Sequence, residues 1–233
     1  MSADMKVFSS IAVQPAIESL LPRFVAESGI RPDFAWNTAP ALVKRLQGGE
    51  TADLLILNRA GMDAMLRDGR VLAGSETTLA SSPAAIAVKA GAPRPDIATP
   101  EALKRTLLAA SAISYSDPAA GGASGIHFAK VIGQLGIADA VNAKNRFPPP
   151  GGLCARFLPT GEVELAIQQV PELKQVAGID IVGPLPEPFQ LVTVFVAGIE
   201  TASAKVKEAG TFLDFLRTPA AAEVFREKGL DPA

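Results

Sequence analysis

The segment from Ser116 to His127 contains the residue types best suited to binding a charged ligand. It reads Ser-Asp-Pro-Ala-Ala-Gly-Gly-Ala-Ser-Gly-Ile-His and joins a strand expected at 112–115 to a helix expected at 124–135. Glycines let a ligand approach the backbone closely, and the first turn of a helix carries N–H groups that have no internal partner. Because the helix dipole is positive at that end, these groups can hold a carboxylate, a phosphate or another oxyanion.

This loop has two interpretations, and the sequence leaves both open. In the first, an anion binds at Gly121, Gly122, Ala123, Ser124 and Gly125. In the second, the same pattern is a capped helix behind a flexible loop. No Lys-Ser or Lys-Thr follows the glycines as in a P-loop, and no G-x-G-x-x-G follows the first strand. Nucleotide hydrolysis and NAD chemistry therefore lose their usual support, and we expect no cofactor.

The single histidine and the single cysteine limit the chemistry further. His127 could act as an acid or a base if it faces the ligand, and otherwise it covers the face of its helix. Cys154 is expected to be a small buried hydrophobic residue. One residue of each kind excludes a disulfide within the chain and a histidine-rich metal site, so no metal is expected.

Small polar residues follow most of the expected strands. In open parallel sheets, ligands bind outside the carboxyl ends of the strands, so several of these residues could meet at one ligand. Each one alone is also typical of a helix N-cap or a turn. Arg59 is the best candidate for a fixed positive charge, the alternative being a solvated arginine. The strand-end residues expected at the ligand are Ser9, Ser10, Asn37, Thr38, Asn58, Arg59 and Ser82.

The elements that must position these residues alternate between strands and helices. The segment at 53–57 is a continuous apolar run, which is typical of a strand buried on both faces. The segment at 162–169 is predicted as a short helix that feeds a strand ending in Gln168-Gln169. The other expected strands are 6–10, 32–37, 82–88, 112–115, 179–182 and 190–197, and the helices are 13–28, 41–47, 61–68, 100–109, 124–135, 202–216 and 219–228. This alternation predicts a doubly wound α/β fold.

Composition excludes several classes of protein. The chain has 233 residues, of which 48% are hydrophobic, which is enough for a large core. Its 22 basic and 24 acidic residues give a net charge of −2, without the basic excess typical of nucleic-acid binding. There is no run of about 20 apolar residues that could insert into a membrane. The first six residues lead directly into a strand, so we expect either a cytoplasmic protein or a form whose secretory signal was removed.

The order of these motifs resembles that of the molybdate-binding proteins of ABC transporters. The resemblance starts with Lys6-Val7-Phe8 and continues through 41–56, where a helix, a glycine turn and Ala52-Asp53 precede the third strand. It spans nearly the whole chain. The remaining matching residues are Met62, Asp63, Leu66, Gly69, Ser116, Asp117, Pro118, Phe212, Leu213, Ala220, Ala221, Ala222, Phe225 and Gly229.

The resemblance implies the type II periplasmic-binding-protein fold, in which two lobes close on a ligand. Each lobe would be a doubly wound mixed sheet flanked by helices. Residues 1–80 with 194–233 would form the first lobe and residues 81–193 the second, with crossings near 80–82 and 190–193. The resemblance also implies a periplasmic monomer whose partners are a small anion and an ABC-transporter permease.

Three positions depart from the family pattern. Ala12 and Ala39 align where the molybdate-binding proteins place serines, and Gln169 aligns where they place a tyrosine that contacts the oxyanion. Each missing hydrogen bond to a buried charge costs about 1.5–3 kcal/mol. We therefore expect an organic di- or tricarboxylate as the ligand, rather than molybdate, bound with help from the amides of Asn37, Gln168 and Gln169.

Two other functions remain open at this point. The stretch 116–128 also resembles a branch of this fold that includes aconitate isomerase. Such an enzyme would move an allylic proton of a tricarboxylate, and His127 is the expected proton carrier. The third alternative is a cytoplasmic anion sensor. Whether the chain is an enzyme is left open, and a binding protein is the favoured prediction.

Overall fold

The computed structural model describes residues 5–149 and 151–233, and these form two compact units. Unit 1 contains the chain up to Ser81 together with Val194–Ala233, and unit 2 contains Ser82–Thr193. The chain passes between the units within two long strands, β4 (Thr77–Lys89) and β8 (Val192–Ile199). None of the helices in the described ranges is both long enough and apolar enough to span a membrane.

Unit 1 is built around a mixed sheet in which β1 lies between two parallel partners. The register pairs Ser10 at the end of β1 with Asn37 at the end of β2. On its other side β1 pairs with β3, which pairs in turn with the antiparallel β8. The short strand β9 pairs with the first part of β4. Besides β4 and β8, the strands of unit 1 are β1 (Met5–Ser10), β2 (Pro32–Asn37), β3 (Leu54–Asn58) and β9 (Asp231–Pro232).

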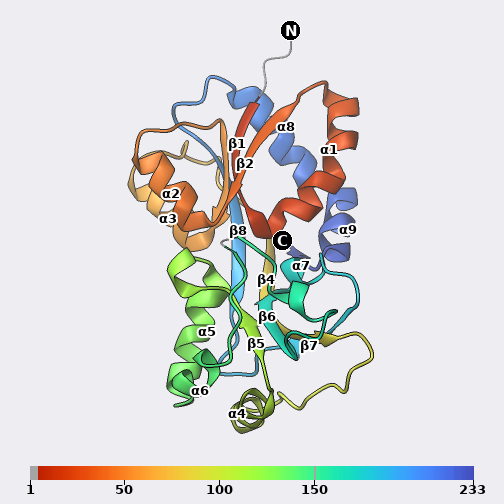
Figure 1. Ribbon diagram of the computed structural model, residues 1–233. Helices are drawn as coiled ribbons and strands as arrows, with labels where there is room; N and C mark the ends of the chain where they lie inside the picture. Colours follow the sequence, from red (N-terminus) through yellow and green to blue (C-terminus); the bar gives the residue numbers. More distant parts are fainter. Residues whose placement is uncertain (1–4, 150) are drawn as a thin grey trace. The chain divides into compact units, whose positions relative to one another are not determined.

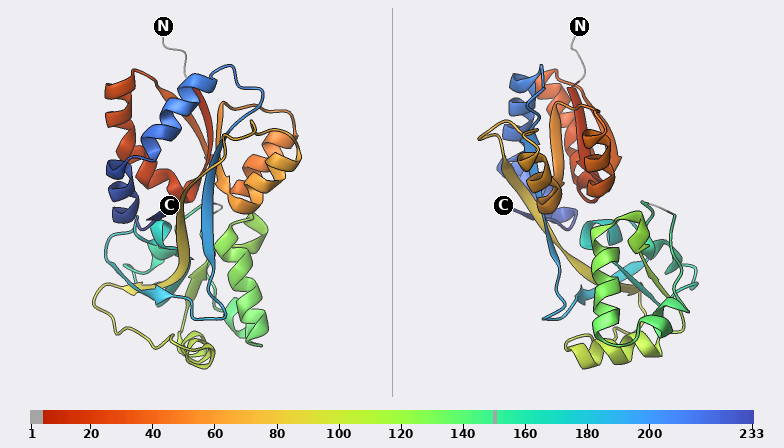
Figure 2. Two further views of the ribbon diagram at one scale, coloured as in Figure 1. Left: turned by 180° about the vertical axis from the view of Figure 1, so that it is seen from behind. Right: turned by 90° about the vertical axis from the view of Figure 1, so that its left-hand side faces the viewer.

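Helices cover both faces of this sheet. Figures 1 and 2 show α1, α8 and α9 on one side and α2 and α3 on the other. On the first side Phe24 packs against Phe212, with ring centroids 4.6 Å apart. Strand β3 is buried on both faces as predicted, because Leu54 faces the first side and Leu55 faces the second. The helices are α1 (Gln14–Ser28), α2 (Ala39–Gln47), α3 (Arg59–Arg67), α8 (Val206–Leu216) and α9 (Pro219–Glu227), with a 3₁₀ turn η1 (Ile11–Val13) before α1.

Unit 2 has its own sheet, in which β5 and β6 are parallel. Strand β4 pairs antiparallel with both β6 and β7. Helices α4, α5 and α6 pack on one face, while η3 and α7 pack on the other. The elements are α4 (Pro100–Ala109), β5 (Ile113–Tyr115), η2 (Pro118–Ala120), α5 (Ala123–Gln134), α6 (Ala138–Asn142), η3 (Cys154–Phe157), β6 (Leu165–Gln169), α7 (Val170–Leu173) and β7 (Ile179–Pro184).

The observed α/β architecture confirms the predicted fold class, and three element predictions need correction. The helix expected at the start of 162–169 is wrong, because only strand β6 forms there. Leu165 and Ile167 point into one core and Ala166 into the other, which is the alternation of a strand. The strand expected at 82–88 is part of the longer β4. The helix expected from residue 202 begins only at Val206.

Candidate ligand-binding residues in the two units

In unit 1 the ends of β1 and β2 bring together buried hydroxyl groups that have no partner. Ser9 and Ser10 are 0% and 5% exposed, and their Oγ atoms, like Thr38 Oγ1, have no hydrogen-bond partner within the described chain. Leaving a buried hydroxyl unsatisfied costs about 1–3 kcal/mol, so three such groups at adjacent strand ends require an explanation. A bound ligand that accepts these hydrogen bonds would supply one.

The three hydroxyl groups do not lie on the same face of the sheet. Val7 belongs to the core beneath α1 and Phe8 to the core beneath α2 and α3. Alternation along β1 therefore places Ser10 on the side of α2 and Ser9 on the opposite side. Thr38 is the N-cap residue of α2 and makes no side-chain capping bond. Ser10 and Thr38 are consequently the pair best placed to share one ligand.

Two of the expected amide side chains have local roles. Asn37 Oδ1 accepts a hydrogen bond from the backbone N–H of Thr38 at 2.8 Å. Asn58 Oδ1 accepts one from the backbone N–H of Gly61 at 2.9 Å and so caps α3. Their carbonyl oxygens therefore stabilise the chain at these strand ends, and any part they have in ligand binding stays a prediction.

The charge of Arg59 is compensated within unit 1. Its Nη1 lies 2.7 Å from Glu76 Oε1 and 3.4 Å from Asp63 Oδ1. The hydrogen bond to Glu76 is the main reason that the pKa of Arg59 is raised. Ser82 is fully buried, and its Oγ donates to the carbonyl of Pro83 at 3.3 Å. Contact of Arg59 or Ser82 with a ligand also stays a prediction.

In unit 2 the glycine loop leads into a helix that lacks a side-chain cap. Asp117 Oδ1 accepts from the backbone N–H of Ala119, and Gly121 adopts a positive φ of 79°. Helix α5 follows with Gly122 as its N-cap residue. The N–H of Ile126 bonds to the carbonyl of Gly122, so helix geometry leaves the preceding N–H groups without partners inside the helix. Those N–H groups belong to Ala123, Ser124 and Gly125.

Gly125 has a packing role in addition to its expected ligand role. A Cβ atom at this position would lie 2.3 Å from the carbonyl oxygen of Ser116. The first turn of α5 therefore rests directly on the start of the glycine loop, and only glycine fits there. This contact fixes where the free N–H groups of the helix point.

The end of β6 carries two glutamines with different roles. Alternation along the strand places Gln169 on the side of α5 and Gln168 on the side of η3 and α7. Gln168 holds the neighbouring loop, because it accepts from the N–H of Cys154 at 2.8 Å and donates to the carbonyl of Gly152 at 3.2 Å. Gln169 Nε2 donates to Thr193 Oγ1 at 2.5 Å, and its Oε1 has no partner among the residues the structure describes.

His127 is held by the backbone of its own unit. Its Nε2 lies 2.8 Å from the carbonyl oxygen of Phe189. Since a carbonyl only accepts hydrogen bonds, Nε2 carries the proton and Nδ1 is the nitrogen left to act as a base. Any acid–base role of His127 is thereby restricted to one atom of the ring.

The sequence reasoning missed Glu172, whose carboxyl group lies at the same strand end. Its Oε2 accepts a hydrogen bond from the backbone N–H of Gln169 at 3.2 Å. Desolvation raises the pKa of Glu172 to about 7, while the backbone of Gln169 and the side chain of Gln168 act in the opposite direction. The signal available in the sequence was the three-residue spacing from Gln169 to Glu172, which is that of a capping box.

Cys154 is buried as expected and stays a neutral thiol. It is 0% exposed, and burial raises its pKa to about 12. Its Sγ lies 3.4 Å from Ser116 Oγ, at the start of the glycine loop. A thiol with so high a pKa is a poor nucleophile, so the cysteine contributes packing rather than chemistry.

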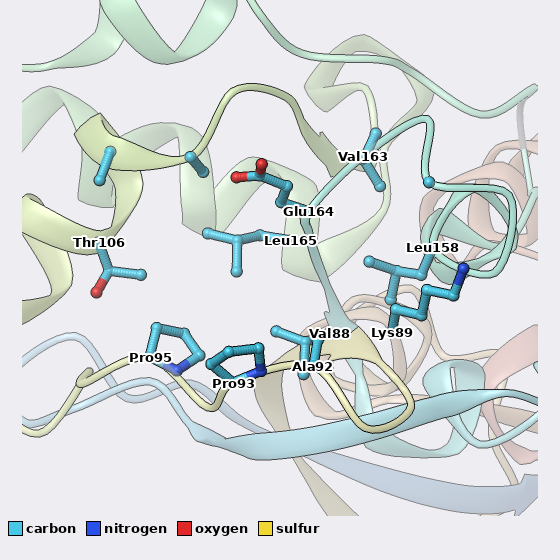
Figure 3. Close-up of a pocket in the computed structure, with 13 residues that line it drawn as sticks. Val88, Lys89, Ala92, Pro93, Pro95, Thr106, Leu158, Val163, Glu164 and Leu165 are labelled. Atoms are coloured by element: carbon cyan, nitrogen blue, oxygen red, sulfur yellow. The ribbon is translucent and has the colours of Figure 1, made fainter.

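A pocket of ≈ 470 Å³ also lies within unit 2. Figure 3 shows its mostly apolar lining, with Pro95 and Thr106 on one side and Leu158 and Lys89 on the other. Thr106 Oγ1 donates to the carbonyl of Asp96, and Glu164 accepts from the N–H of Ser111. None of the residues predicted at the ligand lines this pocket.

Comparison with known proteins identifies relatives of the whole chain. An aconitate isomerase from Pseudomonas sp is 32% identical over 237 residues, covering 98% of this chain and 87% of the relative. The periplasmic molybdate-binding protein of Azotobacter vinelandii superposes with a TM-score of 0.75 at 18% identity, covering 97% of this chain and 98% of that chain. The sulfate-binding protein SubI of Mycobacterium tuberculosis H37Rv gives a TM-score of 0.74 at 16% identity, covering 99% and 87%.

These similarities confirm the expected resemblance to molybdate-binding proteins and to the branch with aconitate isomerase. The identities to the two solved structures are low, so those structures show the shared type II periplasmic-binding-protein fold alone. The family model of bacterial extracellular solute-binding proteins matches residues 5–231, which is almost the whole chain. The chain therefore belongs to the family of bacterial extracellular solute-binding proteins.

Proposed function

We propose that the protein binds a small organic di- or tricarboxylate as the substrate-binding protein of an ABC transporter. The observation that carries this proposal is the set of buried hydroxyl groups at the ends of adjacent strands that have no partner among the described residues, above all those of Ser10 and Thr38. The N–H groups in the first turn of α5, which have no partner within the helix, add donors from unit 2. In this proposal the lobes formed by residues 1–80 with 194–233 and by residues 81–193 close on the ligand.

The side chains at the three positions that differ from the molybdate-binding proteins favour a carboxylate over a tetrahedral oxyanion as the ligand. Ala12 and Ala39 are 8% and 6% exposed, and a methyl group offers no hydrogen bond. Gln169 presents an amide where the family has a phenol. A planar carboxylate needs fewer donors around each oxygen than molybdate does, and a second carboxylate can use the donors of the other lobe. The proposed partner is an ABC-transporter permease, and the proposed state is a periplasmic monomer.

A ligand panel tests this proposal. Purified protein would be melted with molybdate, sulfate, phosphate, citrate, cis-aconitate and trans-aconitate. A ligand at 100 times its Kd should raise the free energy of unfolding by about 2.7 kcal/mol. We expect that rise with at least one polycarboxylate and not with molybdate. A rise with molybdate alone would contradict the assignment.

Removing the unpartnered hydroxyl groups should affect binding and stability differently. Ser10→Ala and Thr38→Ala each delete a donor to a charged group, so the Kd measured by calorimetry should rise roughly 10- to 100-fold. The unliganded variants should be no less stable than the wild type, because neither hydroxyl has a partner to lose among the described residues. Ser19→Ala is the matched control, since that exposed hydroxyl donates to the carbonyl of Pro15 in its own helix. Unchanged affinity in both variants would exclude these hydroxyls from the site.

A second candidate function is the isomerisation of an unsaturated tricarboxylate. The observation that favours it is the 32% identity to an aconitate isomerase over 98% of this chain. Proton NMR of cis- or trans-aconitate incubated with the protein would show the interconversion directly. Binding without interconversion would leave the transport function as the remaining proposal.

A further inference from the structure

The pocket in unit 2 lies where β4 ends and β6 begins, and it has the size of a site for a small organic molecule. Its volume is ≈ 470 Å³, and the described residues that line it all belong to unit 2. Pro93 and Pro95, in the loop after β4, line it across from Leu165 (Figure 3). The buried apolar side chains in its lining are Val88, Leu158, Val163 and Leu165. The apolar part of a ligand would therefore cover apolar protein surface here.

Hydrogen bonds hold the walls of this pocket together. Thr106 Oγ1 donates to the carbonyl of Asp96 at 2.7 Å, which ties the loop with the two prolines to α4. Glu164 Oε2 accepts from the N–H of Ser111 at 3.0 Å, and the N–H of Glu164 bonds to the carbonyl of Ala112 at 2.9 Å. These bonds tie the segment before β6 to the residues that follow α4. Because the walls are held in this way, little conformational entropy has to be lost when a ligand binds.

The charged groups around the pocket differ in whether they hold a partner. The carbonyls of Leu108 and Ala110, at the end of α4, accept from Lys144 Nζ at 2.8 and 2.5 Å. The carboxylate of Glu164 holds a backbone N–H, and Figure 3 shows it well apart from the ammonium of Lys89. Lys89 is exposed and has no hydrogen bond or ion pair with any residue that the structure describes. The charge left free at the pocket is therefore positive.

We propose that this pocket is a second binding site, which takes a monocarboxylate with a long apolar chain. The chain lies against the prolines and the buried side chains, and the carboxylate pairs with Lys89. A small polycarboxylate would place further charges against apolar surface, which costs desolvation free energy without a compensating partner. A cation with the same chain would meet the ammonium of Lys89. This site therefore selects a different ligand from the one proposed for the strand-end residues.

Calorimetry with three ligands of equal chain length tests the chemical class. Decanoate, 1-decanol and decylamine would each be titrated into the purified protein. We expect Lys89→Glu to raise the Kd for decanoate roughly 5- to 30-fold, because an attraction is replaced by a repulsion of similar size. The Kd for the uncharged 1-decanol should change less than twofold. Lys104→Glu is the matched control, because this exposed lysine of α4 does not line the pocket, and its Kd for decanoate should stay within twofold of wild type.

A second variant tests the location of the site. Ala109 is the exposed last residue of α4 and lines the pocket, so the indole of Ala109→Trp would occupy part of the volume. We expect the Kd for decanoate and for 1-decanol to rise at least about 10-fold. The Kd for any polycarboxylate that binds in the ligand panel should stay within twofold, because no residue predicted at that ligand lines this pocket.

The remaining outcomes each decide against the proposal. It is overturned if decanoate does not bind, if decylamine binds as tightly as decanoate, or if Ala109→Trp leaves the Kd for decanoate unchanged. Displacement of decanoate by citrate or an aconitate would place decanoate at the strand-end residues and also overturn the second site. Should Ala109→Trp not fold, Lys89→Glu decides, since an unchanged Kd for decanoate in that variant contradicts the pairing with Lys89. None of these results bears on the polycarboxylate function, which the ligand panel tests.

Discussion

Gly125→Ala should destabilise the protein and weaken carboxylate binding in the same variant. The added methyl group would lie 2.3 Å from the carbonyl oxygen of Ser116, and 3.0 Å from both its carbonyl carbon and its Cβ. The nearest of these atoms are backbone, so the contact cannot be relieved by rotating a side chain. Overpacking of this kind costs about 1–3 kcal/mol, which corresponds to a fall in Tm of roughly 2–12 °C for a chain of this size.

The effect on binding follows from the position of the clash. Relief requires the first turn of α5 to move away from the glycine loop, and the N–H groups proposed to hold the ligand move with it. We expect the Kd for the carboxylate to rise at least about 10-fold. Gly133→Ala is the control, because it lies in the same helix and nothing in the structure comes within 4 Å of its added Cβ. That change should stabilise α5 by about 0.5–1 kcal/mol without affecting the Kd.

The two readouts separate the packing role of Gly125 from its ligand role. A wild-type Tm in Gly125→Ala would contradict the contact with Ser116. A lowered Tm with an unchanged Kd would confirm the contact but exclude the start of α5 from the ligand site. Calorimetric titration beside a thermal melt of both glycine variants gives the answer.

The fold was predictable because its apolar pattern is regular. The run at 53–57 is buried on both faces because β3 lies between two layers of helices, and a buried parallel strand requires such a run. The failure at 162–169 has a physical reason as well. Leu165, Ala166 and Ile167 form a short continuous apolar run, and such a run does not distinguish a buried strand from a buried segment of helix. The short helices α6 and α7 carry too few residues to produce a readable period.

The positions of the candidate site residues were predictable from the sequence. Whether their polar groups have partners in the folded protein was not. Ser10 ends β1 and Thr38 directly follows β2, and the sequence predicts both at strand ends. Whether their hydroxyls have partners depends on packing across the sheet, which no local pattern contains. Arg59 illustrates the same limit, because its pairing with Glu76 joins residues 17 positions apart. Glu172 escaped notice because its desolvation arises from the tertiary structure of unit 2.

The half-buried Glu172 should make the free energy of unfolding depend on pH, because its carboxyl group is desolvated in the folded protein. Its pKa in the folded protein is about 7, raised by desolvation from an ordinary value of 4.5. Between these values the folded state binds more protons than the unfolded state, so the free energy of unfolding falls as pH rises. The contribution is fully present below pH 4.5 and is lost as pH rises through about 7. A pKa shift of this size corresponds to a change of about 3 kcal/mol in the free energy of unfolding.

Glu172→Gln should remove this dependence, because an amide stays neutral throughout the range. The free energy of unfolding of the variant, taken relative to wild type, should therefore rise by about 3 kcal/mol between pH 4.5 and pH 8. Urea unfolding at pH 4.5, 6, 7 and 8 measures the difference. Cys154 does not interfere, since its pKa of about 12 keeps it neutral over this range. A constant difference in Glu172→Gln would mean that its carboxyl group titrates normally, which would contradict the predicted pH dependence.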